Sequence, residues 1–262
     1  MRYQFTDTHC HLDFDSLSGD LTSLLSQCEQ LGITRIIVPS IGPQNWQKVL
    51  TLTQQKLPIV IQACLGIHPW FLSEFNNNSL EQLGILAGEN KANIIAIGEA
   101  GIDGKVAEEQ DNMALQVEVF REQIQLANQL DKPLIVHHRR SHQDVYRELA
   151  RVKCERGGVI HAFSGSYQQA TNYIDLGFKL GIGGTITYPR AQKTLKAVSK
   201  LPLSSLVLET DAPSMPLFGQ QGEDNSPINI PGIFTQLCSL RSESPDKIAE
   251  QLQANVSELF DY

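Results

Sequence analysis

Six of the seven histidines lie where short apolar segments of the sequence end. They are His9, His11, His68, His137, His138 and His161. If each apolar segment is a strand, chance would place about one histidine of seven at such ends, because eight strand ends make up about an eighth of the chain. Histidine is the commonest metal ligand in proteins. The clustering at strand ends therefore predicts a metal site.

His9 and His11 are separated by one residue. On an extended segment both imidazoles point to the same side, with their Cα atoms about 6.6 Å apart. At that separation both can reach one cation with bonds of about 2.0–2.1 Å. Cys10, between them, points to the opposite side. We therefore predict that the two histidines bind one metal ion and that Cys10 does not.

Two carboxylates, Glu99 and Asp211, directly follow apolar segments, where an unpaired charge is costly to bury. An ion pair with Arg139 would neutralise one of them, but anions among histidines are better neutralised by metal ions. Asp7 lies two residues before His9 and faces the same side of an extended segment. We expect Asp7 to support a ligand rather than to bind the metal itself.

The predicted ligand set combines imidazole and carboxylate without thiolate, which fits Zn²⁺, Mn²⁺ or Mg²⁺. The set is His9, His11, Glu99, either His137 or His138, His161 and Asp211. Six ligands are too many for one catalytic ion that keeps a position open. Two divalent cations about 3.5–4 Å apart, bridged by Glu99, fit the set better.

Apolar segments rich in Ile and Val alternate with helical patterns along the whole chain, as expected for parallel strands covered on both faces. The segments are residues 5–9, 35–41, 59–66, 94–98, 134–137, 159–161, 178–182 and 206–209. Eight such units without a linker predict one domain, residues 1–262, with a TIM-type (β/α)8 barrel and the architecture of metallo-dependent hydrolases. A doubly wound sheet would use fewer strands and a glycine-rich loop after the first strand, which is absent here.

Two helices and one loop are predicted in particular. Residues 110–130 and 141–154 show apolar positions at helical spacing. Ser141 and Asp144 resemble a capping box at the start of the second helix. The segment 213–232, rich in Pro, Gly and Asn, follows the last strand, where a barrel places a substrate-binding loop.

Composition limits the location and the partners. No apolar run approaches the roughly 20 residues of a membrane span, the N-terminus has no apolar signal core, and the five cysteines are scattered. We expect a cytoplasmic protein with reduced thiols and no obligate protein partner. The net charge of -8 disfavours a tight grip on long duplex DNA. A nucleic-acid substrate would therefore be attracted by local positive charge, including bound metal ions.

Six motifs resemble, in order and spacing, those of the TatD family of metal-dependent hydrolases and deoxyribonucleases. They are TDTHCHLD (6–13), GIHP (66–69), GEAGID (98–103), PLIVHHR (133–139), HAFSG (161–165) and ETDAP (209–213). The block GGTITYPR (183–190) is similar to the YjjV-like branch of that family. The resemblance covers the length of the chain.

The resemblance implies a barrel, a dinuclear centre and phosphodiester hydrolysis, often 3′–5′ exonuclease action on single-stranded DNA. By motif position it assigns metal binding to His9, His11, Glu99, His137, His161 and Asp211. It thus favours His137 over His138. A metal ion can lower the pKa of water to about 7, and we expect Asp211 to act as ligand and general base and Glu99 as the bridge. His68 and Arg139 are candidates to bind the phosphate of a DNA end or of a small phosphodiester.

Three interpretations stay open. Trp70, Phe71 and Phe163 either stack on bases or pack under loops. An amidohydrolase-like barrel acting on an amide, lactone or other ester would share most ligands, but it usually carries a modified lysine where this chain has Glu99. A metal-binding protein without turnover would be expected to have lost a ligand or the base, and none is missing.

Overall fold

Eight parallel strands form one sheet, in which each strand pairs with the next along the chain. The strands are β1 (Phe5–Asp7), β2 (Ile33–Pro39), β3 (Val60–Leu65), β4 (Ile94–Asp103), β5 (Leu134–Arg139), β6 (Gly158–Ile160), β7 (Phe178–Ile182) and β8 (Leu206–Leu208). The computed structural model describes residues 3–74, 76 and 78–261. The ends of the predicted domain, residues 1–2 and 262, lie outside these described residues.

The first and last strands meet through backbone hydrogen bonds at their ends. The amide of Thr8 donates to the carbonyl of Leu208 (2.9 Å), that of Asp211 to His9 (2.8 Å), and that of His11 to Ala212 (2.8 Å). These bonds close the sheet into the predicted TIM-type barrel. A doubly wound sheet is excluded because its strand order reverses, whereas here the order follows the chain.

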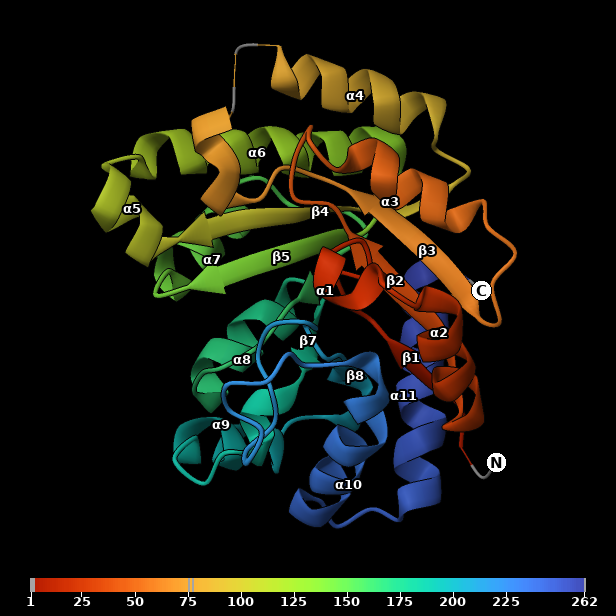
Figure 1. Cartoon of the computed structure of the whole chain (residues 1–262). Helices are drawn as coiled ribbons and strands as arrows, with labels where there is room; N and C mark the ends of the chain where they lie inside the picture. Colours follow the sequence, from red (N-terminus) through yellow and green to blue (C-terminus); the bar gives the residue numbers. More distant parts are fainter. Residues whose placement is uncertain (1–2, 75, 77, 262) are drawn as a thin grey trace.

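The helices surround the strands, and Figure 1 shows them around the outside of the barrel. They are α1 (Asp15–Ser18), α2 (Leu21–Gln30), α3 (Trp46–Thr53), α4 (Ser79–Glu89), α5 (Gly104–Gln110), α6 (Met113–Leu130), α7 (His142–Arg151), α8 (Tyr167–Asp175), α9 (Gln192–Val198), α10 (Ile230–Leu240) and α11 (Pro245–Phe260). Short 3₁₀ turns are η1 (Pro69–Glu74), η2 (Gly184–Thr187), η3 (Leu203–Ser205) and η4 (Pro227–Asn229).

The strands separate two apolar layers. In β2, Ile36 and Val38 belong to the larger core cluster, which contains most of the buried helix residues, whereas Ile37 belongs to a second cluster. Successive strand residues face opposite sides, so the second cluster fills the barrel. It contains Ile37, Cys64, Ile95, Ala96, Ile135, Val159 and Val207 with Val256, Leu259 and Phe260 of α11. Because side chains fill the interior, a ligand can enter only at the ends of the strands.

The prediction for the fourth strand is wrong at its end. β4 continues past residue 98 to Asp103 and pairs with β5, with a register shift between Ile97 and Ala100. Gly101 lies opposite His137 and Asp103 opposite Arg139. The apolar pattern stops earlier than the strand because this part of β4 carries polar residues. The other strands agree with their predicted ranges within two residues at either end.

Two helix predictions also need correction. The helix predicted over 110–130 is α6, which begins only at Met113, because Asp111 has a left-handed φ of 49° that ends α5. Ser141 precedes α7 but does not cap it. Its hydroxyl donates instead to the carbonyl of Ile102 and accepts from the amide of Arg139. The predicted capping box is not formed, because the hydroxyl of this buried serine joins the ends of β4 and β5.

Gly101 permits the close approach of β4 to β5. Its φ is +153°, and a Cβ at this position would lie 2.1 Å from the carbonyl oxygen of His137. We expect Gly101→Ala to lower the free energy of unfolding by about 1–3 kcal/mol, because the strands must separate. Urea unfolding measures this change. The control is Gly88→Ala in α4, where a Cβ meets nothing within 4 Å and alanine favours the helix. Equal urea midpoints for Gly101→Ala and the wild type would contradict this packing.

Candidate metal centre

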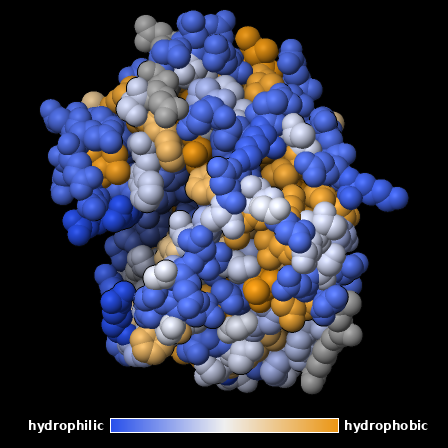
Figure 2. Space-filling model, viewed as in Figure 1, coloured by the Kyte–Doolittle hydropathy of each residue, from blue (hydrophilic) through white to orange (hydrophobic). Residues whose placement is uncertain are grey.

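Seven side chains converge at the end of the barrel to which the strands point. They are His9 and His11 after β1, His68 after β3, Glu99 in β4, His137 in β5, His161 after β6 and Asp211 after β8. A cavity of about 410 Å³ opens over them, and all except His9 line it. In Figure 2 the surface is hollowed on the left, the side to which the arrowheads of β4 and β5 point in Figure 1. Six of the side chains are buried, and Asp211 is partly exposed.

Four donor atoms form a first group around His9. Its Nε2 lies 3.3 Å from Nε2 of His11, 3.1 Å from Oε2 of Glu99 and 3.5 Å from Oδ1 of Asp211. Nε2 of His11 lies 3.6 Å from the same Glu99 oxygen and 3.7 Å from the same Asp211 oxygen. Tetrahedral ligands at about 2.0–2.1 Å from a cation are about 3.3–3.4 Å apart. The spacing of these donors therefore fits a divalent cation.

A second group surrounds the other oxygen of Glu99. Its Oε1 lies 3.0 Å from Nδ1 of His137, 3.2 Å from Nε2 of His68 and 3.5 Å from Nε2 of His161. The nitrogens of His68 and His137 are 3.2 Å apart. The atoms of His68, Glu99 and His137 also lie close enough together to hold a metal ion. The Glu99 carboxylate thus contributes one oxygen to each of the two donor groups.

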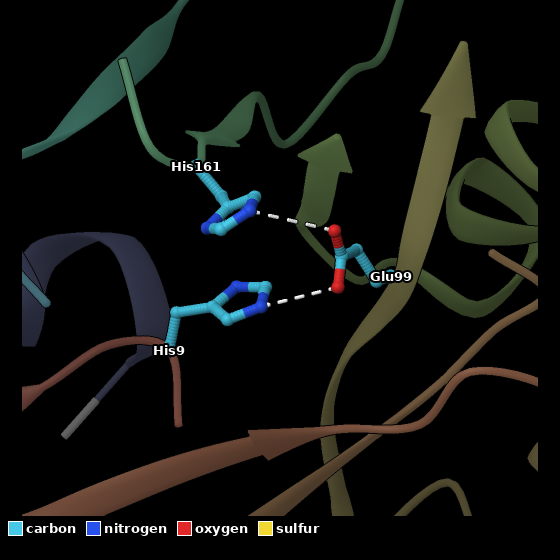
Figure 3. Close-up of side chains that lie close together, drawn as sticks. All are labelled: His9, Glu99 and His161. Carbon is cyan, nitrogen blue, oxygen red and sulfur yellow. Dashed lines mark ion pairs between the residues drawn. The ribbon is translucent and has the colours of Figure 1, made fainter. Parts of the chain in front are cut away.

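Figure 3 shows how Glu99 joins the two groups. The rings of His9 and His161 stack with centroids 3.7 Å apart and planes inclined by 18°. Each ring directs Nε2 to a different oxygen of the Glu99 carboxylate. The stack therefore fixes the orientation of both histidines relative to the shared carboxylate.

The close packing of these side chains shifts their pKa values. Burial alone would raise the pKa of Glu99, but His68, His9 and His161 around it hold that pKa well below the usual range. Burial, together with the nearby His161, lowers the pKa of His9. An ionised carboxylate beside a neutral imidazole is the protonation state in which both act as metal ligands. The protonation states of Glu99 and His9 therefore fit a bound cation.

Two carboxylates that the sequence predictions did not include lie beside the ring nitrogens of His137 and His161 that point away from Glu99. Oδ2 of Asp103 lies 3.1 Å from Nε2 of His137, and Oε1 of Glu209 lies 3.3 Å from Nδ1 of His161. Such outer carboxylates fix the tautomer and orientation of a metal-binding histidine. The sequence carried a signal for both, because Asp103 lies four residues after Glu99 and Glu209 two before Asp211, on the same side of an extended segment.

Asp7 does not contact an imidazole. One oxygen accepts hydrogen bonds from the amides of His9 (3.2 Å) and Thr210 (3.0 Å), and the other accepts from the Thr210 hydroxyl (2.6 Å). Asp7 therefore supports the backbone of His9 and of the segment that carries Asp211. Asp7 thus supports a ligand segment, as predicted, but it contacts the main chain and not the ring of a histidine.

The two predicted phosphate-binding residues lie at different depths. His68 lies within the second donor group, deeper than a surface contact would require. The Arg139 side chain is 43% exposed, lies 3.9 Å from Asp103 and stands 5.7 Å from the ring centroid of Trp70. The indole of Trp70 also donates to Asp103. Arg139, Trp70 and Asp103 therefore form a connected group at the edge of the cavity.

The structure also places the cysteine, the second histidine and the three aromatic residues considered in the sequence analysis. Cys10 lies in the hydrophobic core and belongs to none of the possible metal groups among the described residues. His138 also lies outside those groups, and its ring centroid is 4.3 Å from that of His142. Trp70 is 45% exposed and lines the cavity together with Phe71. Phe163 is only 1% exposed, so stacking on a base is excluded for this residue.

The fold and the donor groups define a metal-dependent hydrolase of the barrel type. The family described as TatD related DNase matches residues 6–261, and the chain belongs to that family. The metal-dependent hydrolase YjjV of Escherichia coli K12 is 44% identical over 98% of each chain, and a Haemophilus influenzae metal-dependent hydrolase is 36% identical over 98% of this chain and 99% of its own.

Solved structures agree with this assignment. The crystal structure of YjjV, a TatD homologue from Escherichia coli, covers 100% of both chains with a TM-score of 0.95 and 44% identity. A TatD-family hydrolase of Entamoeba histolytica has a TM-score of 0.86 at 21% identity over 99% of each chain, which shows the fold alone. Within the described part of the chain, no helix is long and apolar enough to cross a membrane.

The contact of Asp103 with His137 leads to a prediction. Asp103→Asn replaces the acceptor that holds Nε2 of His137, so the opposite nitrogen, Nδ1, loses its fixed direction toward Glu99. We expect affinity for Mn²⁺ or Zn²⁺ to fall about 10–100-fold, the usual effect of removing such a partner. Calorimetric titration of the purified protein measures this affinity. Asp224→Asn, an exposed change of the same charge, is the control, and equal affinities in both variants would refute the positioning role.

Proposed function

We propose that this chain is a phosphodiesterase of the DNase type that removes nucleotides from the 3′ end of single-stranded DNA with two divalent cations. The observation that supports it best is the position of the Glu99 carboxylate, with one oxygen in each donor group. A carboxylate between two ions is typical of two-metal phosphoester hydrolysis. Membership of the TatD-related DNase family supports the same substrate class.

The residues divide between two cations. His9, His11, Asp211 and Oε2 of Glu99 would hold the first, and His137, His161 and Oε1 of Glu99 the second. When bound, Zn²⁺, Mn²⁺ or Mg²⁺ would stabilise negative charge on the phosphoryl oxygens and lower the pKa of water. The Asp103 and Glu209 carboxylates keep the histidines of the second group in position.

Asp211 is the residue best placed to accept a proton. Its Oδ1 faces His9 and His11, while Oδ2 has no hydrogen-bond or ion-pair partner within the described residues. Its side chain is 13% exposed at the cavity, against 2% for Glu99. A carboxylate oxygen that faces the cavity can take the proton from an attacking water.

Arg139 and His68 would bind the phosphate beside the second donor group. Both line the cavity. The guanidinium of Arg139 presents paired N–H donors that match a phosphate, and its contact with Trp70 limits its motion. His68 is in contact with Glu99, so it would reach the phosphate near the reacting atoms.

The substrate test compares bond types directly. Metal-loaded protein is offered end-labelled single-stranded DNA, RNA of the same sequence, a small phosphodiester, and a panel of amides and lactones. We expect turnover of DNA. A 3′ label should be released at once as a mononucleotide, whereas a 5′ label should stay on a progressively shorter strand until the end of the digestion. Turnover of amides or lactones alone would remove the phosphodiesterase assignment and favour an amidohydrolase.

Glu99→Gln tests the shared carboxylate. The amide keeps the size but loses the charge that both cations require, so bound metal and DNA hydrolysis should fall together, with activity lower by about 10²-fold or more. Metal content by mass spectrometry and the initial rate are measured on the same sample. The matched control is Glu108→Gln on the exposed surface of α5. Full metal content and full activity in Glu99→Gln would refute the bridging role.

A further inference from the structure

One long segment of this acidic chain carries only positive charge. Residues 176–208 contain no aspartate or glutamate, although the net charge of the chain is -8. The same segment contains five cationic residues, namely Lys179, Arg190, Lys193, Lys196 and Lys200. The segment covers β7, η2, α9 and β8, so the positive charge is concentrated on one side of the barrel.

Three of these lysines lie on one exposed face. Lys193 and Lys196 lie in α9 at the helical spacing i and i+3, and Lys200 lies two residues after α9 ends. All three are exposed. Thr194 and Val198 of α9 are buried. Within the described part of the chain none of the three lysines forms an ion pair, whereas Lys179 pairs with Glu258 at 2.9 Å. Their charge is therefore available to an external anion.

The three lysines border a groove with an aromatic wall. A cavity of about 430 Å³ between α8 and α9 is lined by Ser166, Tyr167, Lys193, Lys196, Ala197 and Lys200. Tyr167 is exposed, at 47% of its full surface. The helices α8 and α9 lie side by side at the lower left of Figure 1, and the same region of Figure 2 is largely hydrophilic. We call this cavity the α9 groove.

The α9 groove lies next to the metal centre. Ser164 lines the metal cavity and Ser166, two residues later, lines the groove. On the other side Arg190 stands 5.0 Å from the ring centroid of Tyr188, and both line a further cavity of about 260 Å³. That cavity shares Met215 with the metal cavity. Cationic and aromatic side chains therefore extend from the metal centre across η2 and α9.

We propose that the α9 groove binds the sugar-phosphate backbone of single-stranded DNA whose 3′ end lies in the metal cavity. The inference rests on the proposed function. Lysines that line a groove beside an exposed ring are the features with which proteins bind single strands, because the cations contact phosphates and the ring stacks on a base. A membrane surface fits less well, because the groove is concave and carries one exposed ring. The groove supplies the local positive charge that an acidic nuclease needs to retain a polyanion.

The test separates long from short substrates. The triple variant K193Q/K196Q/K200Q is compared with K56Q/K91Q/K153Q, which has the same net charge and changes exposed lysines before β3, β4 and β6, at the opposite end of the barrel. The metal-loaded proteins are assayed for hydrolysis of a 20-nucleotide oligothymidylate and of a dinucleotide. They also bind a phosphorothioate 20-mer, measured by fluorescence anisotropy between 50 and 200 mM salt.

Affinity for DNA falls as salt rises, so the plot of log affinity against log salt has a negative slope. Loss of three phosphate contacts should make this slope less negative by about 2 for a single strand. We expect the groove variant to bind the 20-mer about tenfold more weakly at low salt, to raise KM for it by a similar factor and to leave dinucleotide hydrolysis unchanged. The control variant should match the wild type. Thermal unfolding of all three proteins verifies that the groove variant is folded.

Two results would overturn the proposal. Equal 20-mer affinity and salt slope in the groove and control variants would show that the lysines do not contact the strand. Loss of binding to phosphatidylserine vesicles by the groove variant, with its 20-mer affinity unchanged, would assign the groove to a membrane. Failure of the proposed function is distinct, because then the wild type itself would hydrolyse neither the 20-mer nor the dinucleotide.

Discussion

The site is organised by one buried carboxylate. Glu99 is 1% exposed and has imidazole nitrogens within 3.6 Å of each oxygen. A carboxylate in such a place is costly unless positive charge compensates it. Five histidines around one carboxylate cannot all be protonated without repelling one another. Divalent cations resolve this conflict, because they neutralise the carboxylate while each imidazole stays neutral.

Barrel closure and metal binding depend on the same residues. The bonds that join the ends of β1 and β8 run through the backbone of His9, His11 and Asp211. Asp7 strengthens this junction by accepting from His9 and Thr210. The ligands of the first donor group are therefore positioned by the fold itself and not by a mobile loop.

The sequence predicted the barrel and most of the side chains that converge at its mouth, because both follow from short periodic patterns. His9 and His11 are two apart, and Glu99 and Asp211 follow apolar runs. The supporting contacts were harder to predict because they depend on packing between strands. Asp103 was missed because the apolar pattern ended before β4 did. Ser141 had a plausible capping sequence, but its burial between two strands gave its hydroxyl another partner. The depth of His68 followed only from the path of the loop after β3.

The account depends most on two cations sharing the Glu99 carboxylate. The direct measurement is anomalous X-ray scattering from a crystal of the protein loaded with Mn²⁺ or Zn²⁺. It should show two metal peaks about 3.5–4 Å apart, one between His9 and His11 near Oε2 of Glu99 and the other near Oε1. A single peak, or two peaks with neither oxygen of Glu99 in coordination distance, would contradict the account.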